Sequence, residues 1–196
     1  MTDVIIISGA SGSGKTTLSK WLAPRLGARV LNAGDVVLRM VLAHDLASVS
    51  RADAGRLFIE RFGELALGPA LLQNLRPSER VIIDGLRLPF AKQLLEDRLG
   101  RTFHLHLDAP DEVRQHRLLL RDGRVDVSRR VESFLPYLKQ EADLVIANLD
   151  LENLVSPSIL RRRSVNIGGP LATKIPSGAS YLAKLDFLSN FGAGAS

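Results

Sequence analysis

The most informative stretch of this sequence is Gly9-Ala10-Ser11-Gly12-Ser13-Gly14-Lys15-Thr16, which fits the Walker A pattern GxxxxGK followed by Ser or Thr. It directly follows an apolar segment, residues 4–7, and it precedes a stretch with a helical pattern. In that context glycines let backbone N–H groups converge on a phosphate, and the dipole of the following helix favours negative charge. We therefore expect this turn to bind phosphate; the alternative is a glycine-rich turn with no ligand.

The residue types in the turn also indicate what accompanies the phosphate. Lys15 supplies a mobile cation, and the Thr16 hydroxyl is a ligand that Mg²⁺ accepts. The predicted cofactors are therefore ATP and Mg²⁺. The residues expected to contact the nucleotide phosphates are Gly9, Ser11, Gly12, Ser13, Gly14, Lys15, Thr16 and Thr17.

Outside the turn, short apolar segments alternate with longer helical stretches. The predicted strands are residues 4–7, 29–31, 81–83, 103–107 and 144–146. Such alternation requires crossover connections, which predicts a three-layer α/β/α fold with a mostly parallel, five-stranded sheet. Ligands of this fold class bind beyond the carboxyl ends of the strands.

Length and composition restrict the remaining possibilities. The chain has 196 residues, 45% of them hydrophobic and 24% charged, which fits one globular domain and excludes a disordered or collagen-like chain. Because it has no cysteine, disulfides and thiolate metal sites are excluded. No basic-then-apolar leader precedes the apolar segment 4–7, which is too short for a membrane span. We expect a cytoplasmic protein that does not associate with membranes.

The net charge of +5 is unevenly distributed. Residues 156–196 carry a net charge of +4 and are rich in Ser, Pro and Gly, whereas residues 1–155 carry only +1. The sequence thus predicts one domain, which contains the phosphate turn, over 1–155 and a basic C-terminal appendage over 156–196. Packing of the appendage on the domain is the simpler expectation, and binding of a nucleic acid is the alternative.

Two further segments carry a family resemblance. Asn32-Ala33-Gly34-Asp35 with Arg39, and Val81-Ile82-Ile83-Asp84-Gly85-Leu86-Arg87, resemble segments of P-loop nucleotide kinases of the adenylate-kinase-like and dephospho-CoA-kinase-like types. The resemblance runs over about residues 4–154. It implies ATP-dependent phosphoryl transfer, with Arg39 and Arg87 at the acceptor.

The two aspartates also have a physical interpretation of their own. Asp84 ends a strand at the same sheet edge as the phosphate turn, where a carboxylate can hold the Mg²⁺ shell; the alternative is a helix N-cap. For Asp35 three roles stay open, namely a catalytic base, a ligand of a metal-bound water, and a helix cap. We predict both as catalytic residues, Asp84 with Thr16 at the metal and Asp35 also at the acceptor.

An arginine-rich helix follows the fourth strand. Arg114, Arg117 and Arg121 are spaced to lie on one helix face, and the segment of about 117–130 resembles a shortened nucleotide-kinase lid. Arg117 and Arg121 match the pattern at the base of the family's lid, so we predict that they stabilise the transferred phosphoryl group. Arg130 is predicted to bind substrate. The alternative is a solvated face paired with acidic residues.

Two smaller signals complete the sequence analysis. Asn148 follows the last strand and resembles the family's asparagine beside adenine, although a turn asparagine is nearly as good an interpretation. His104 and His106 share a strand face, but a zinc site is disfavoured because no third ligand lies nearby in sequence.

The function predicted from the sequence is an ATP-dependent phosphotransferase whose partner is a small-molecule acceptor, first of all a nucleoside monophosphate or related nucleotide. A kinase of a hydroxyl acceptor such as dephospho-CoA is the alternative within the same class. The alternative of another class is an ATP-gated nucleic-acid-binding protein that uses the basic appendage. The oligomeric state is left open.

Overall fold

A computed structural model describes residues 2–43, 49–99, 102–123 and 132–148. Its centre is one sheet of five strands in the order β2-β3-β1-β4-β5, and every pair of neighbours is parallel. The strands are β1 (Asp3–Ser8), β2 (Arg29–Asn32), β3 (Arg80–Asp84), β4 (Thr102–Asp108) and β5 (Leu144–Ala147). All five predicted strands are present.

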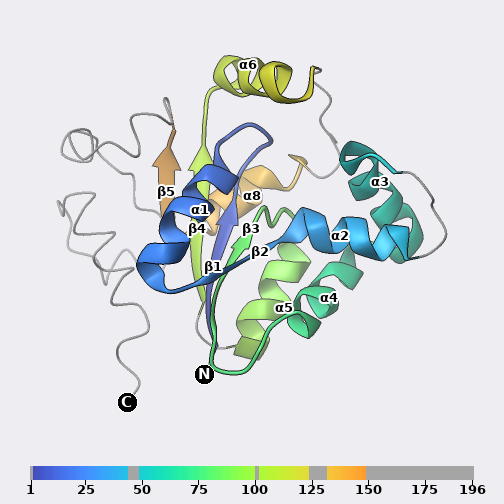
Figure 1. Ribbon diagram of the computed structural model, residues 1–196, viewed down its shortest axis with the longest axis vertical. Helices are drawn as coiled ribbons and strands as arrows, with labels where there is room; N and C mark the ends of the chain where they lie inside the picture. The colour runs from blue at the N-terminus through green and yellow to red at the C-terminus, as the bar shows by residue number, and fades with distance from the viewer. Residues whose placement is uncertain (1, 44–48, 100–101, 124–131, 149–196) are drawn as a thin grey trace.

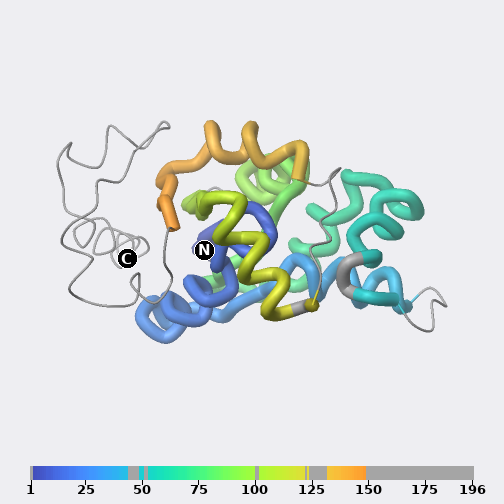
Figure 2. The backbone as a smooth tube through the Cα atoms, turned by 90° about the horizontal axis from the view of Figure 1, so that it is seen from above, coloured from blue at the N-terminus to red at the C-terminus, as the bar shows by residue number. Residues whose placement is uncertain are grey.

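Helices flank this sheet and cross its carboxyl edge (Figure 1). They are α1 (Lys15–Leu26), α2 (Ala33–Leu42), α3 (Arg51–Phe62), α4 (Leu67–Gln73), α5 (Pro89–Leu99), α6 (Asp111–Asp122) and α8 (Leu135–Gln140), with a short 3₁₀ turn at Glu64–Ala66. From above, α1 lies on one side of the sheet and α5 and α8 lie on the other (Figure 2). The predicted three-layer α/β/α fold is confirmed.

The alternation of side chains along β1 explains why both faces of the sheet are covered. Val4 and Ile6 belong to a core formed with α2, α4 and α5, whereas Ile5 and Ile7 belong to a second core with α1, β4 and β5. All four are at most 1% exposed. A strand that is apolar on both faces cannot lie at a solvated surface, so it occupies the middle of a parallel sheet.

Local sequence signals set the ends of the helices near the phosphate turn. Gly27 adopts a left-handed conformation, φ 57°, and ends α1 so that the chain can turn back into β2. The Asn32 side chain accepts a hydrogen bond from the backbone N–H of Asp35, at 3.1 Å, and thereby caps α2. The side chain that caps α2 is thus Asn32 and not Asp35, and the two other roles considered for Asp35 stay predictions.

A buried polar cluster lies in the sheet next to the turn. Ser8 Oγ lies 2.7 Å from His104 Nε2 and 2.8 Å from His106 Nδ1. Because His104 Nδ1 must donate to the Glu141 carbonyl, at 3.3 Å, its Nε2 accepts from the Ser8 hydroxyl, and Ser8 Oγ then accepts from His106 Nδ1–H. The cluster therefore forms one directed chain of hydrogen bonds with both imidazoles neutral.

Part of the predicted organisation lies outside the described residues. This applies to residues 124–130 of the expected lid, including Arg130, and to the basic appendage over 156–196. Residues 117–122 of the expected lid belong to α6. Within the described segments, no helix is both long and apolar enough to cross a membrane.

Candidate active site

The phosphate turn joins β1 to α1 and depends on glycine at points of close approach. Gly9 has φ 137°, and a Cβ atom there would lie 2.2 Å from the Leu107 carbonyl oxygen of β4. Gly12 has φ 77°, and a Cβ atom there would lie 2.6 Å from the Arg114 carbonyl oxygen of α6. Both distances are shorter than any real Cβ contact, so the turn fits between β4 and α6 only without side chains at these positions.

Lys15 begins α1 and is buried, with 7% of the residue exposed. Its Nζ donates to the Ala10 carbonyl oxygen at 2.6 Å, so the side chain folds back over the turn. Burial, and next the charge of Arg87, lower the pKa of Lys15 to about 7, against the opposing charges of Asp84 and Glu132. A phosphate bound at the turn would contact a lysine side chain that the protein has already removed from water.

Asp84, at the end of β3, forms the second part of the site. Its Oδ2 accepts hydrogen bonds from Thr16 Oγ1 at 2.8 Å and from Asn32 Nδ2 at 2.9 Å. Its Oδ1 is buried and has no hydrogen-bond partner, although the residue is only 1% exposed. A buried carboxylate oxygen of this kind is suited to a cation, so Thr16 and Asp84 fit a Mg²⁺ ion. Asp84 caps no described helix.

Arginines from two elements contact the turn. Arg87, after β3, donates to Ser11 Oγ at 3.0 Å, and Arg114 of α6 donates to the Ser11 carbonyl oxygen at 3.1 Å. Arg117 donates to the Gly12 carbonyl oxygen at 3.3 Å. These contacts place three guanidinium groups beside the phosphate turn.

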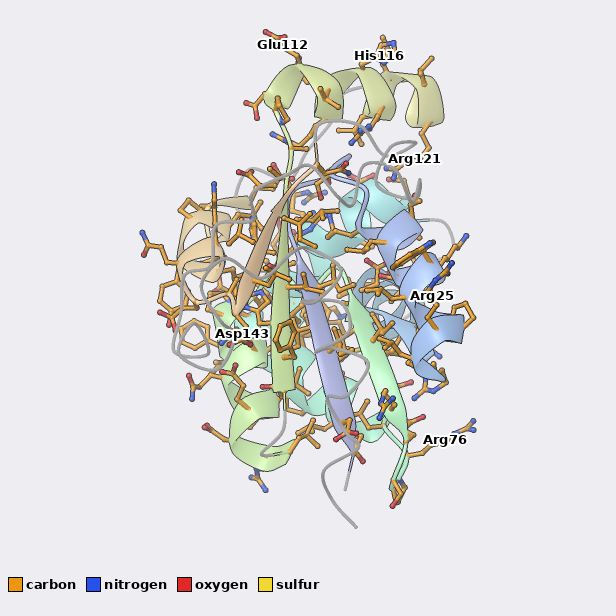
Figure 3. All side chains as sticks on the ribbon, turned by 90° about the vertical axis from the view of Figure 1, so that its left-hand side faces the viewer. Arg25, Arg76, Glu112, His116, Arg121 and Asp143 are labelled. Carbon is orange, nitrogen blue, oxygen red and sulfur yellow. The ribbon has the colours of Figure 1, made fainter. Side chains whose placement is uncertain are left out.

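Arg121 lies farther along the same helix. It points from α6 toward the body of the protein, whereas Glu112 and His116 point away from it (Figure 3). Burial lowers the pKa of Arg87, and the charges of Arg121 and Arg114 add to this effect, so the three guanidinium groups share one region. The arginine face of α6 is therefore turned toward the phosphate site.

Asn148, after β5, contacts the turn from the opposite edge. Its Nδ2 donates to the Ser13 carbonyl oxygen at 2.6 Å, and its backbone N–H donates to the Asp108 carbonyl oxygen at 2.6 Å. Asn148 Oδ1 and Ser13 Oγ are buried without hydrogen-bond partners. Asn148 is thus bound to the phosphate turn, and whether it also contacts adenine stays a prediction.

Two of the predicted acceptor residues, Asp35 and Arg39, lie on α2. Asp35 is half-buried in the first turn, and its backbone is linked through Asn32 to Asp84. Arg39 is exposed and donates to Asn74 Oδ1 at 3.2 Å. Arg87, which we also predicted at the acceptor, contacts the turn through Ser11, and its contact with an acceptor stays a prediction. Thr17 is exposed on α1.

Three residues of the site were not selected from the sequence. Arg114 was recognised on the arginine face, but Arg117 and Arg121 were preferred. Its position in the first turn after β4, and so at the carboxyl edge of the sheet, is the signal that could have identified it. Asn32 is the last residue of β2, at the same edge of the sheet, and could have been found in the same way.

Glu132 is the third, and it comes from a distant part of the chain. Its Oε1 accepts from the Ser11 backbone N–H at 2.8 Å, and Oε2 lies 4.0 Å from Arg114 Nη1. No sequence pattern marks it. Among the described residues, no group of three or more His, Cys, Asp or Glu side chains could hold a metal ion.

Comparison with known proteins agrees with this geometry. A family model described as an AAA domain matches residues 5–133. The chain belongs to this AAA domain family. A UPF0200 protein of Pyrobaculum aerophilum is 36% identical to this AAA domain protein over 135 residues, which cover 69% of this chain and 75% of the relative.

Other relatives and solved structures carry kinase names. A cytidylate kinase of Methanosphaera stadtmanae is 25% identical over 160 residues, covering 78% of this chain and 86% of that protein. The crystal structure of a gluconokinase from Sinorhizobium meliloti 1021 superposes with a TM-score of 0.54 at 17% identity, covering 97% of each chain. The AAA domain protein therefore has the fold of P-loop kinases.

Proposed function

We propose that the protein is an ATP-dependent kinase that transfers a phosphoryl group to a nucleoside monophosphate or a related nucleotide. The observation that carries the proposal is the convergence of Lys15, Arg87 and Arg114 on one phosphate-binding turn, next to the Asp84–Thr16 pair. Little covalent chemistry is needed in phosphoryl transfer, so positioned charge supplies most of the catalysis.

Each part of the site has a distinct task in this proposal. The backbone N–H groups of the turn and Lys15 hold the β- and γ-phosphates, and the arginines of α6 stabilise the charge on the phosphoryl group in transit. Thr16 and Asp84 would hold Mg²⁺, which neutralises phosphate charge when bound. Asn148 fixes the turn through Ser13 and is proposed to lie beside adenine.

The acceptor is proposed to bind at α2, through Asp35 and Arg39. Sequence similarity to a cytidylate kinase over most of both chains supports a nucleoside monophosphate, whose phosphate oxygen attacks without a base. A hydroxyl acceptor such as dephospho-CoA is the second candidate, because Asn32 links the first turn of α2, with Asp35, to Asp84. A carboxylate at that place could accept the proton of an attacking hydroxyl.

The test is a screen for transfer of the γ-phosphate from ATP to nucleoside monophosphates, dephospho-CoA, small sugars and a 5′-hydroxyl oligonucleotide. We expect transfer to a nucleoside monophosphate and a loss of about 100-fold or more in kcat for Lys15→Ala. Lys20→Ala is the matched control, because Lys20 is exposed on the same helix. Normal turnover in Lys15→Ala, or no transfer to any acceptor, would contradict the proposal.

A further inference from the structure

A carboxylate already occupies a donor group of the phosphate turn. The Ser11 N–H is one of the backbone groups that a phosphate-binding turn directs at its anion, and it donates to Glu132 Oε1 at 2.8 Å. Gln or Asn would satisfy such a donor as well. Satisfying this donor therefore does not require a charged side chain, and the negative charge of Glu132 must act on other groups.

The Glu132 carboxylate lies among the groups that the proposed function assigns to phosphate. Glu132 Oε2 lies 4.0 Å from Arg114 Nη1, and the side chain is only 18% exposed. Burial lowers the pKa of Lys15 and of Arg87, and the negative charge of Glu132 opposes that shift in both. Glu132 thus compensates the charge of the same cations that the proposed function assigns to phosphate.

The position of Ser11 indicates which phosphate is concerned. Gly14 and Lys15 stand at the N-terminus of α1, and Ser11 lies at the other end of the turn, bonded to Arg87 and Arg114. The arginines are the groups expected to contact the phosphoryl group in transit. Glu132 therefore sits where the terminal phosphate of ATP, and not the phosphates of ADP, is expected.

We propose that Glu132 is a specificity-determining residue whose carboxylate competes with the γ-phosphate of ATP for the terminal-phosphate position of the turn. This inference rests on the proposed function, since it needs nucleotide phosphates at the turn. ADP leaves the Glu132 contacts in place. ATP must replace these contacts, so Glu132 lowers the affinity for ATP relative to the affinity for ADP. When ADP or no nucleotide is bound, the Glu132 carboxylate balances the positive charge of the arginines.

The test is the ratio of MgATP affinity to MgADP affinity, measured by calorimetry for the full chain and for Glu132→Gln. Glutamine keeps an oxygen that can accept from the Ser11 N–H, so the turn retains its partner while the competing charge is removed. We expect the ratio to rise about tenfold, which is the size of effect that one hydrogen bond to a charged group has.

The matched control is Glu112→Gln, which removes the same charge from the outward face of α6 (Figure 3). It should leave the ratio unchanged. A ratio that is unchanged or lower in Glu132→Gln, while the native protein binds ATP, overturns this inference and leaves the proposed function intact. Absence of ATP binding in both the native protein and Glu132→Gln overturns both.

Discussion

Asn32 connects the backbone of Asp35 to the carboxylate of Asp84, and the proposed reaction assigns these two aspartates different tasks. Its Oδ1 accepts from the backbone of Asp35, and its Nδ2 donates to Asp84 Oδ2. One amide side chain therefore caps α2 and orients the strand-end carboxylate. Because the cap is made by Asn32, the carboxylate of Asp35 can be changed without removing the cap of α2.

Asp35→Asn separates the two acceptor classes. A nucleoside monophosphate attacks through an oxygen that is already ionised, so we expect kcat to change by less than about threefold while the acceptor KM rises. With a hydroxyl acceptor, loss of the base would lower kcat by about 100-fold or more. Steady-state kinetics with the acceptor identified in the screen gives both constants. An unchanged melting temperature is the control for folding, and a large fall in kcat with KM retained would contradict the nucleotide acceptor.

At the scale of elements, the phosphate turn and α6 form one packed unit. The backbone of Gly12 is so close to α6 that a Cβ atom would lie 2.6 Å from the Arg114 carbonyl oxygen. Any side chain at Gly12 must therefore move either the turn or the helix that carries the arginines. Since catalysis here depends on position, such a shift acts on activity more than on folding.

Gly12→Ala is expected to lower kcat/KM by about 100-fold, because a displacement of about 1 Å is enough to misplace the arginines. Gly27→Ala is the control: Gly27 also has a positive φ, 57°, but a Cβ atom there meets nothing within 4 Å. It should cost only the left-handed backbone strain, about 1 kcal/mol of unfolding free energy, at normal activity. Kinetics and chemical denaturation of both variants decide the matter, and equal activities would show that the close approach is unimportant.

The strands and the turn were predictable because their signals are local. Five apolar segments and a glycine-rich loop need no tertiary information. The contact between Ser11 and Glu132 spans 121 positions in the chain, and no periodic pattern encodes it. The choice among Arg114, Arg117 and Arg121 likewise depends on the angle at which α6 crosses the sheet edge, which packing sets. Local sequence was therefore enough to predict the phosphate turn, whereas the charged residues around it could be identified only from the folded structure.

At the scale of the whole molecule, two hydrophobic cores lie on the two faces of the sheet. The sheet also contains a buried chain of hydrogen bonds that joins Ser8 to His104 and His106. Ser8 directly precedes the phosphate turn and belongs to β1, the central strand. The cluster therefore fixes the start of the turn to β4. Protonation of His104 would break this chain, because its Nε2 would become a donor and the Ser8 hydroxyl would lose its acceptor. His106 donates through Nδ1 in either state, so its protonation is disfavoured by burial of the charge and not by loss of this hydrogen bond.

This cluster predicts loss of stability in mild acid. Burial, aided by the charge of Lys92, lowers the pKa of His104 from 6.5 to about 3, and burial lowers that of His106 to about 4 despite Asp108. Between these values and 6.5 the unfolded chain binds more protons, so stability is full above pH about 6.5 and falls as the pH decreases. We expect the melting temperature to drop by about 10 °C between pH 7.5 and pH 5.

His106→Asn tests whether the imidazoles cause the drop, because asparagine keeps a donor for Ser8 Oγ and cannot be protonated in this range. The variant should show a smaller loss of melting temperature between the two pH values, whatever its absolute stability. His116→Gln, at an exposed position on α6, should retain the full loss (Figure 3). Because Asp143, whose pKa burial raises, responds to acid in the opposite sense, it cannot produce the expected fall. An equal loss in His106→Asn and in the native protein would therefore assign the acid sensitivity to groups outside this cluster.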